Sequence, residues 1–206
     1  RYLPRLGELT HFEIDYWHGP TCEREHRAHE YGTRACEIGA MLGGGCYAVD
    51  MAQFLFESPI VQVQAMTPNA RRPQRTTLAI VRCENGLTGK ISATDEAFGR
   101  YAFNIRILGR QGRIDGNRAE LSQSRGDDLM IPGEPPASGA VSCHPFGPMI
   151  AEFVSCVRRG VETSCSLAAA ANTHKVCFKT EEKARFSLGG TMTAPPVDEP
   201  WAFTGD

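Results

Sequence analysis

The sequence predicts an α+β fold, in which helices cover one face of a mostly antiparallel, open sheet. Three observations predict it: a run of alternating apolar and polar segments in the middle of the chain, an Asn85-Gly86 turn between two of them, and two helical apolar patterns after them. A run of strands followed by helices is typical of this class. We expect residues 1–206 to form a single domain.

The first strand is expected over residues 11–17, HFEIDYW, where polar and apolar residues alternate and aromatic residues are frequent. Residues 21–37 are charged and have no clear apolar face, so we expect a loop or a short exposed helix there. Residues 42–45 are interpreted as flexible backbone. A helix is expected over residues 46–56, because its apolar residues recur at helical spacing.

Further strands are expected in the middle of the chain, over residues 60–66, 76–83, 87–94 and 101–108. Asn85-Gly86 supplies the positive φ angles of a two-residue hairpin turn, which predicts antiparallel pairing of the two strands beside it. Glycines occupy turn positions in the segment after these strands, and a short edge strand is expected at residues 119–122.

The last third of the chain is expected to contain a loop or linker and then two helices. Residues 126–140 are rich in Gly, Pro, Asp and Ser, which favours the loop. A helix is predicted over residues 149–158, and Ser166 is expected to cap a longer helix that runs toward Phe186. A last strand is expected at residues 191–194.

Composition excludes several classes of partner. With 22 basic and 24 acidic residues, the formal charge is −2, so neither nucleic acid nor an anionic membrane surface is an expected partner. No apolar run approaches the roughly 20 residues of a membrane helix. The eight cysteines lack a C-x-x-C pair, which favours reduced thiols and a cytoplasmic location. Because the chain begins with Arg1 rather than Met, we expect a fragment, a processed product or a trimmed form of a longer protein.

Tyr47 and Asp50 lie one turn apart near the start of the predicted 46–56 helix, so they share a face. A phenol and a carboxylate in this place are suited to acid–base work on a hydroxyl. The alternative is an ordinary helix start, in which the Asp favours the helix dipole. The glycines at positions 43–45 lack the G-x-G-x-x-G spacing. They either allow a phosphate to approach the helix start or let the backbone pass closely under a neighbour.

A second cluster of polar residues has the pattern C-x-x-x-H-x-x-H-E, formed by Cys22, His26, His29 and Glu30. On a helix these side chains could meet one metal ion. The residues between them are charged, however, which favours a solvated or substrate-facing loop. No metal site is therefore expected.

Residues 39–55, GAMLGGGCYAVDMAQFL, resemble the signature of the glucose–fructose oxidoreductase, inositol dehydrogenase and rhizopine catabolism (Gfo/Idh/MocA) family, roughly G-G-x-L-x-D-x-G-x-H-x-x-D. Tyr47 stands at the His position, as in members that resemble dihydrodiol dehydrogenase, and Asp50 at the final Asp. Gly43 stands where the family has a catalytic Asp. RCENGLTGKISAT and YAFNIRILGRQGRIDG also resemble strand pairs of the family's second domain.

The resemblance implies a C-terminal domain like that of glyceraldehyde-3-phosphate dehydrogenase, which binds the substrate of an NAD- or NADP-dependent oxidoreductase. The substrate would be a sugar, polyol or diol with a CH–OH group. The nucleotide-binding domain would lie outside this chain, and its lysine would pair with Tyr47 during proton transfer. The chain alone is then expected to be inactive. The alternative is a non-catalytic sugar-binding or dimerisation module of the same fold.

The resemblance also assigns candidate site residues. Tyr47 is the expected catalytic group, and Gly44 and Gly45 are expected to contact the cofactor. The substrate is expected to contact Trp17, His18, His26, His29 and Asp50. Apolar strand residues such as those at 78–81, together with the family's habit, predict a homodimer or tetramer formed through the sheet face.

Overall fold

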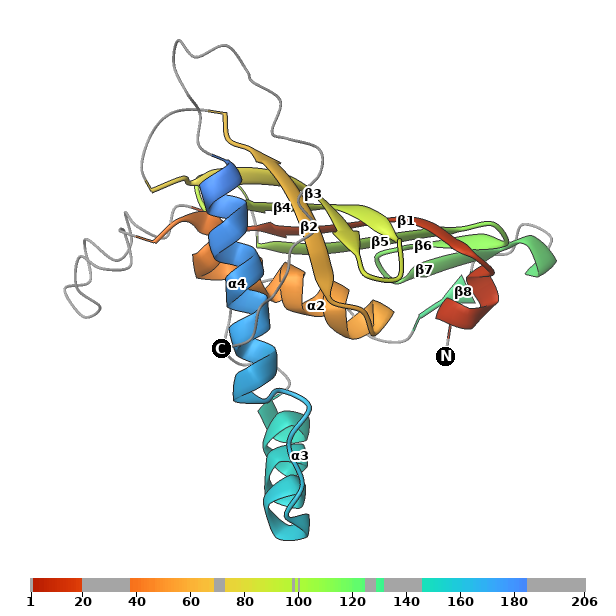
Figure 1. Ribbon diagram of the computed structural model, residues 1–206. Coiled ribbons are helices and arrows are strands. Elements are labelled where there is room, and N and C mark those ends of the chain that lie inside the picture. Colours follow the sequence, from red (N-terminus) through yellow and green to blue (C-terminus); the bar gives the residue numbers. More distant parts are fainter. Residues whose placement is uncertain are drawn as a thin grey trace.

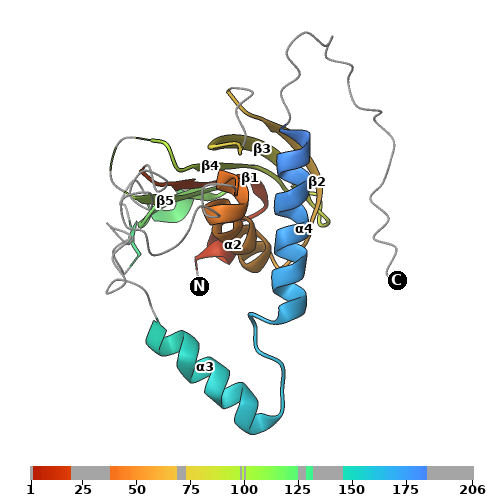
Figure 2. The same ribbon diagram turned by 90° about the vertical axis from the view of Figure 1, so that its left-hand side faces the viewer.

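The computed structural model describes residues 2–19, 38–68, 73–97, 99, 101–124, 129–131 and 146–184. In these residues a broad sheet lies over two helices, and a third helix lies farther away (Figures 1 and 2). This confirms the predicted α+β class, with a mostly antiparallel open sheet and helices on one face. The described strands are β1 (Leu9–Trp17), β2 (Ile60–Met66), β3 (Thr76–Cys83), β4 (Thr88–Thr94), β5 (Ala102–Gly109), β6 (Gly112–Asp115), β7 (Arg118–Leu121) and β8 (Leu129–Met130).

The strands are hydrogen-bonded in the order β2-β3-β4-β1-β5-β6-β7-β8. β1 therefore lies inside the sheet, where it pairs with β4 in parallel and with β5 antiparallel. The remaining pairs are antiparallel. A parallel neighbour requires a crossover, and the helix before β2 supplies part of it.

The core lies between the sheet and the helices because each strand alternates its side chains. On β1, Phe12 and Ile14 are fully buried, and the Phe12 ring lies 4.7 Å from that of Phe56 on the helix below. Ile91 of β4 is equally buried on this face, whereas Ile80 of β3 points the other way and is 58% exposed. One face of the sheet is thus packed and the other is open.

The helix below β1 begins with a π-helical turn, η3 (Met41–Gly45), and continues as α2 (Cys46–Phe56). The expectation of flexible backbone at residues 42–45 was wrong, because this segment is helical and partly buried. The predicted bounds of α2 are confirmed. Residues 57–59 then connect α2 to β2.

Helix α4 (Leu167–Lys183) crosses the same face of the sheet as α2 (Figure 2). Its predicted cap is confirmed, since Ser166 Oγ accepts a hydrogen bond from the Ala169 amide at 3.2 Å. The helix ends at Lys183, before the expected Phe186. Residues 185–206, and with them the predicted last strand, lie outside the described residues.

Helix α3 (Phe146–Arg159) lies away from the sheet in both views (Figures 1 and 2). Its sequence is strongly amphipathic, and Cys156 is its one buried residue. Its apolar stripe is largely exposed, including Ile150 at 55% and Phe153 at 56%. A helix with this pattern usually buries its stripe against another element.

Two details of the predicted strands need correction. The hairpin after β3 has three loop residues, because the Cys83 amide bonds the Leu87 carbonyl and Gly86 alone in the loop has positive φ. The strand predicted at the sheet edge, residues 119–122, corresponds to β7, but β8 pairs with β7 and forms the edge instead. Part of the predicted 126–140 loop is therefore a strand.

None of the five described cysteines forms a disulfide. Cys22, Cys36 and Cys143 lie outside the described residues. No described helix is long and apolar enough to cross a membrane.

Candidate functional site

The end of β1 sends neighbouring side chains to opposite faces of the sheet. Tyr16 points to the helix-covered face, where its ring approaches Gly44 and Tyr47. Trp17 points to the open face, where its indole Nε1 donates to Ser92 Oγ at 3.0 Å. This follows from the two-residue repeat of a strand. The structure therefore offers two candidate sites, which share Tyr101 and Phe103: both residues contact the Tyr16 ring and line the open-face pocket.

The first site is an aromatic cluster around Tyr16 on the helix-covered face. The Tyr16 ring is stacked on that of Tyr47, with 5.9 Å between centroids, and lies 6.4 Å from that of His18. The Tyr101 ring meets it edge-on at 5.3 Å. Burial, followed by the neighbouring phenols, raises the pKa of Tyr16 to about 12, so this phenol stays neutral.

Tyr47 is the accessible phenol of this cluster, with 61% of its surface exposed. It is the second residue of α2, directly after the π-helical turn. π-helical turns inside helices are frequent at functional sites. The geometry therefore presents Tyr47 to solvent beside the packed Tyr16 ring, and its role as a general acid or base stays a prediction.

Gly44 and Gly45 are both buried and closely packed. A Cβ on Gly44 would overlap the Tyr16 ring, and one on Gly45 would lie 2.7 Å from the Cβ of Ala93. Gly43, in contrast, is exposed with open space around it. The structure gives Gly44 and Gly45 the close-packing role, and their contact with a cofactor stays a prediction.

Two amide donors at the start of this helix already have partners outside the helix. The Ala40 amide bonds the Gln74 carbonyl at 2.8 Å, and the Leu42 amide donates to Glu181 Oε1 at 3.2 Å. Free amides normally make a helix start attractive to phosphate. Here the amides of Ala40 and Leu42 are occupied, and the Glu181 carboxylate lies beside the helix start, which disfavours phosphate binding there.

Asp50 is exposed on α2, one turn beyond Tyr47. Its Oδ1 accepts a hydrogen bond at 2.8 Å from the hydroxyl of Thr173, which comes from α4. One oxygen of the carboxylate is thus held by the protein. Asp50 and Tyr47 both lie in α2, and the contact of Asp50 with the substrate stays a prediction.

His18 joins the aromatic cluster, and its ring Nδ1 lies 2.9 Å from the Gly19 carbonyl oxygen. The other two predicted histidines, His26 and His29, lie outside the described residues, as do Cys22 and Glu30. In the part of the chain that the structure describes, no group of three potential ligands could hold a metal ion.

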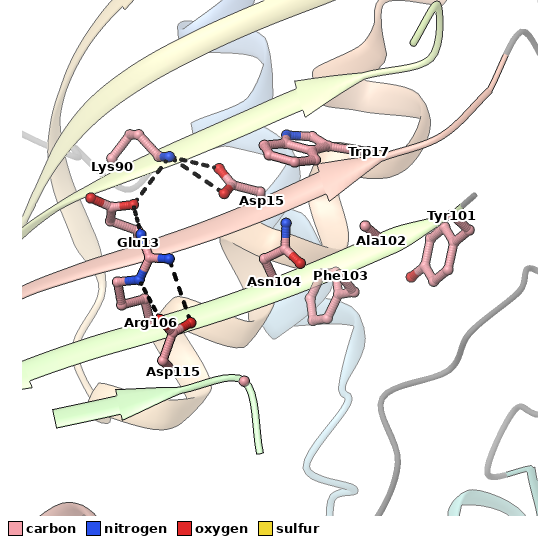
Figure 3. Close-up of a pocket in the computed structure, with 11 residues that line it drawn as sticks. Glu13, Asp15, Trp17, Lys90, Tyr101, Ala102, Phe103, Asn104, Arg106 and Asp115 are labelled. Carbon is pink, nitrogen blue, oxygen red and sulfur yellow. Dashed lines mark hydrogen bonds and ion pairs between the residues drawn. The ribbon is translucent and has the colours of Figure 1, made fainter. Parts of the chain in front are cut away.

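The second site is the open-face pocket, a cavity of about 610 Å³ above the middle strands (Figure 3). Trp17 and Tyr101 form part of its wall, whereas Tyr47 is not among the residues that line it. The contact of Trp17 with the substrate stays a prediction. A row of ion pairs lies on its floor. Its shortest N···O distances are 3.0 Å for Lys90–Asp15, 3.3 Å for Lys90–Glu13, 3.2 Å for Arg106–Glu13 and 3.2 Å for Arg106–Asp115.

The charges on this floor compensate one another. Burial alone would raise the pKa of Glu13, but the hydrogen bond and charge of Lys90 and the charge of Arg106 outweigh burial and lower it. With its ionised groups already paired, the floor offers a ligand less electrostatic binding energy than unpaired charges would. The aromatic cluster is therefore the better candidate for proton transfer.

Sequence reasoning missed three residues near the aromatic cluster. Tyr16 and Tyr101 could have been found from the strand alternation, which sets Tyr16 beneath the α2 start. Asp95 follows β4, and burial raises its pKa to about 6 although Arg75 lies 2.6 Å from its Oδ2. No local pattern marks Asp95, because its burial arises only from the folded chain.

Comparison with known proteins assigns the family. The sequence profile described as the GFO/IDH/MocA C-terminal domain matches residues 4–115, more than half of the chain. The chain belongs to this family. No curated protein sequence matches it.

Solved structures of family-type dehydrogenases share the fold. Levoglucosan dehydrogenase in complex with NADH and L-sorbose is 18% identical, with a TM-score of 0.71 over 89% of this chain and 58% of that one. UDP-N-acetylglucosamine 3-dehydrogenase from Acidithiobacillus ferrooxidans is 12% identical, with a TM-score of 0.65 over 89% and 56%. Myo-inositol 2-dehydrogenase from Lactobacillus plantarum is 13% identical, with a TM-score of 0.63 over 87% and 55%. The chain therefore spans little more than half the length of these proteins.

Proposed function

We propose that this GFO/IDH/MocA C-terminal domain binds the substrate of an NAD- or NADP-dependent oxidoreductase that acts on the CH–OH group of a sugar, polyol or diol. Within the family, Tyr47 at the His position favours the dihydrodiol dehydrogenase-like members. The observation that carries the proposal is the exposed Tyr47 phenol, stacked on buried Tyr16 at the start of a helix.

The similar structures support this substrate class. One is levoglucosan dehydrogenase in complex with NADH and levoglucosan, and another is a dehydrogenase from Bordetella pertussis in complex with NADH and UDP-GlcNAcA. Each of those proteins is thus bound to NADH together with a sugar or a UDP-sugar. We extend the cofactor type and the substrate class to this chain, and leave the particular sugar open.

A nicotinamide, when bound, would accept or supply the hydride at the substrate carbon. The residues of this chain perform the remaining tasks. In oxidation the phenolate form of Tyr47 would take the proton from the substrate hydroxyl, and in reduction the phenol would give its proton to the carbonyl oxygen, while Tyr16 stays neutral and packs against the Tyr47 ring. His18 and Asp50 supply hydrogen bonds to other hydroxyls of the substrate.

The described residues fit only one end of a dinucleotide. Exposed Gly43 leaves room beside Tyr47 for a nicotinamide ring, whereas the occupied amides at Ala40 and Leu42 offer no phosphate cradle. We therefore propose that a separate nucleotide-binding domain supplies most of the cofactor contacts and that this chain alone is inactive. The exposed apolar stripe of α3 is suited to such a domain contact.

Replacing Tyr47 tests the proposal directly. In the full-length encoded protein, Tyr47→Phe keeps the ring but removes the proton, so we expect kcat to fall by about 100-fold or more on a substrate that the wild type turns over. The assay follows nicotinamide absorbance with levoglucosan, myo-inositol and UDP-N-acetylglucosamine. Tyr2→Phe is the matched control outside the cluster. Wild-type turnover by the Tyr47 variant would show that Tyr47 is not the acid or base.

A non-catalytic sugar-binding module is the second candidate. Gly43, at the position of the family's catalytic Asp, favours it, since no carboxylate can act from that residue. Absence of cofactor consumption across the sugar panel, with sugar-dependent shifts in melting temperature retained, would support this candidate over the enzyme.

We also propose a homodimer or tetramer of a cytoplasmic protein, assembled through the open sheet face. Exposed Met66, Leu78 and Ile80 on that face support it. Sedimentation at micromolar concentration is the test, and a monomer would contradict it.

A further inference from the structure

Helix α4 holds the Tyr47 helix at two separate points. At the helix start, Glu181 Oε1 accepts a hydrogen bond from the Leu42 amide at 3.2 Å. One turn beyond Tyr47, the Thr173 hydroxyl donates to Asp50 Oδ1 at 2.8 Å. The two contacts lie on either side of the proposed acid or base.

The contact to Asp50 is the end of a directed chain of hydrogen bonds. The Ile60 amide, at the start of β2, donates to Gln53 Oε1 at 3.2 Å. This fixes the Gln53 amide, whose Nε2 then donates to Thr173 Oγ1 at 3.1 Å. Because a hydroxyl has one proton, accepting from Gln53 leaves the Thr173 proton for Asp50. Thr173 is 3% exposed, so water does not compete for this proton.

The contact at the helix start replaces a local cap. The residue before η3, Ala40, makes no side-chain cap hydrogen bond, so the Leu42 amide depends on Glu181. Gly39 makes room for this carboxylate, since a Cβ there would overlap it. The sequence thus keeps a side chain out of the position that Glu181 occupies.

We propose that Thr173 and Glu181 are positioning residues for the reaction of Tyr47, an inference that rests on the proposed function. Thr173 fixes the direction of the Asp50 carboxylate beside the substrate. Glu181 fixes the π-helical turn, and through it the position of Tyr47. Neither side chain touches the reacting atoms.

A pair of Thr173 variants in the full-length encoded protein tests the first contact. Thr173→Val keeps the shape and removes the hydroxyl, so we expect KM for a turned-over sugar to rise about tenfold with little change in kcat. Thr173→Ser restores the hydroxyl and is expected to stay within about twofold of wild type. Rotamer populations of Asp50, measured by NMR couplings, should broaden in the Val variant alone. Unchanged KM and unchanged Asp50 rotamers in that variant would overturn the inference for Thr173.

Glu181→Ala and Glu181→Gln test the second contact. The Gln side chain still accepts from the Leu42 amide, so we expect about a tenfold loss of kcat in the Ala variant and recovery in the Gln variant. Hydrogen exchange of the Leu42 amide should accelerate in the Ala variant only. Equal exchange and equal kcat in Ala and wild type would overturn the inference for Glu181.

The two levels of the proposal fail in different ways. If Tyr47→Phe keeps wild-type turnover, the proposed function is wrong, and with it the positioning roles. If Tyr47→Phe abolishes turnover while the Val and Ala variants match wild type, the positioning inference alone is wrong. If no sugar is turned over, unchanged Asp50 rotamers and Leu42 exchange still overturn it. If Thr173→Val fails to fold at the assay temperature, Thr173→Ala with the same readouts replaces it.

Discussion

The two faces of the central sheet are built from the same strands but differ in what stabilises them. On the helix-covered face, apolar side chains are buried against α2 and α4, and glycines allow rings to approach the backbone. On the open face, a row of alternating charges crosses neighbouring strands, from Lys90 through Glu13 and Arg106 to Asp115. Strand alternation decides on which face a side chain lies. Substitutions on that face lower the free energy of unfolding strongly only where another element covers it.

Substitution of two isoleucines on adjacent strands is expected to give the largest difference in stability between the two faces. Ile91→Ala empties a fully buried site, so we expect it to lower the free energy of unfolding by about 3 kcal/mol or more. Ile80→Ala removes the same atoms from a residue that is 58% exposed in the single chain, and should cost less than about 1 kcal/mol at concentrations where the chain is monomeric. Urea denaturation measures both. A cost for Ile80→Ala that grows with protein concentration would show that a second copy covers the open face.

Much of this packing could be predicted because local patterns determine it. The alternation in β2 and β3 and the helical spacing in α2 place the bounds of these elements correctly. The parallel pairing of β1 with β4 could not be predicted, since it depends on a crossover and leaves no trace in either strand. The π-helical turn was missed because three consecutive glycines resemble a flexible loop.

Two neighbouring glycines give the next test, on the helix-covered face alone. Gly44→Ala places a methyl group in the Tyr16 ring, and we expect a loss of about 2 to 3 kcal/mol as the ring is displaced. Gly43→Ala meets open space and gains helix propensity, so its effect should be within about 1 kcal/mol of wild type and stabilising in sign. Chemical denaturation with tyrosine fluorescence checks both. Equal destabilisation by the two variants would contradict the packing seen around Tyr16.

The candidate site was predictable only in part. The Tyr47 helix start follows from the sequence, because its residue types and spacing are local. The separation of Trp17 from His18 also follows from alternation, although the sequence analysis assigned both to one pocket. The contacts of Thr173 and Glu181 with the Tyr47 helix could not be predicted, since more than a hundred residues separate the partners.

Asp95, which follows β4, gives a pH-dependent test. The stability that it contributes changes with pH in the direction opposite to that of most ion-paired carboxylates. Its pKa in the folded chain is raised by burial to about 6, above its ordinary value, so its contribution is present in acid and is lost as pH rises. Between roughly pH 4 and pH 7, wild type should lose about 2 kcal/mol of unfolding free energy relative to Asp95→Asn. Denaturation of both proteins across this range is the measurement. A difference that does not change with pH would contradict the raised pKa.

Glu13 on the open face is expected to have a smaller effect on stability than Asp95, and its contribution changes with pH in the opposite direction. Burial alone would raise its pKa, but Lys90 and Arg106 lower it, so the stability it contributes is present above its ordinary pKa and is lost as pH falls. Because the pair with Lys90 is partly exposed, Glu13→Gln should cost at most about 1 kcal/mol at neutral pH. The cost should shrink in acid and in high salt, since both weaken the ion pairs.

A double-mutant cycle of Glu13→Gln with Lys90→Met isolates the pair on the open face. At concentrations where the chain is monomeric, we expect a coupling energy of about 0.5 kcal/mol that salt reduces, as for other exposed pairs. A second copy over the open face would remove this pair from water. Its coupling would then exceed about 1.5 kcal/mol, resist salt and grow with protein concentration. That result would show that the charged row lies in an interface. Both faces of the sheet would then be buried, one by helices of the same chain and the other by a second copy.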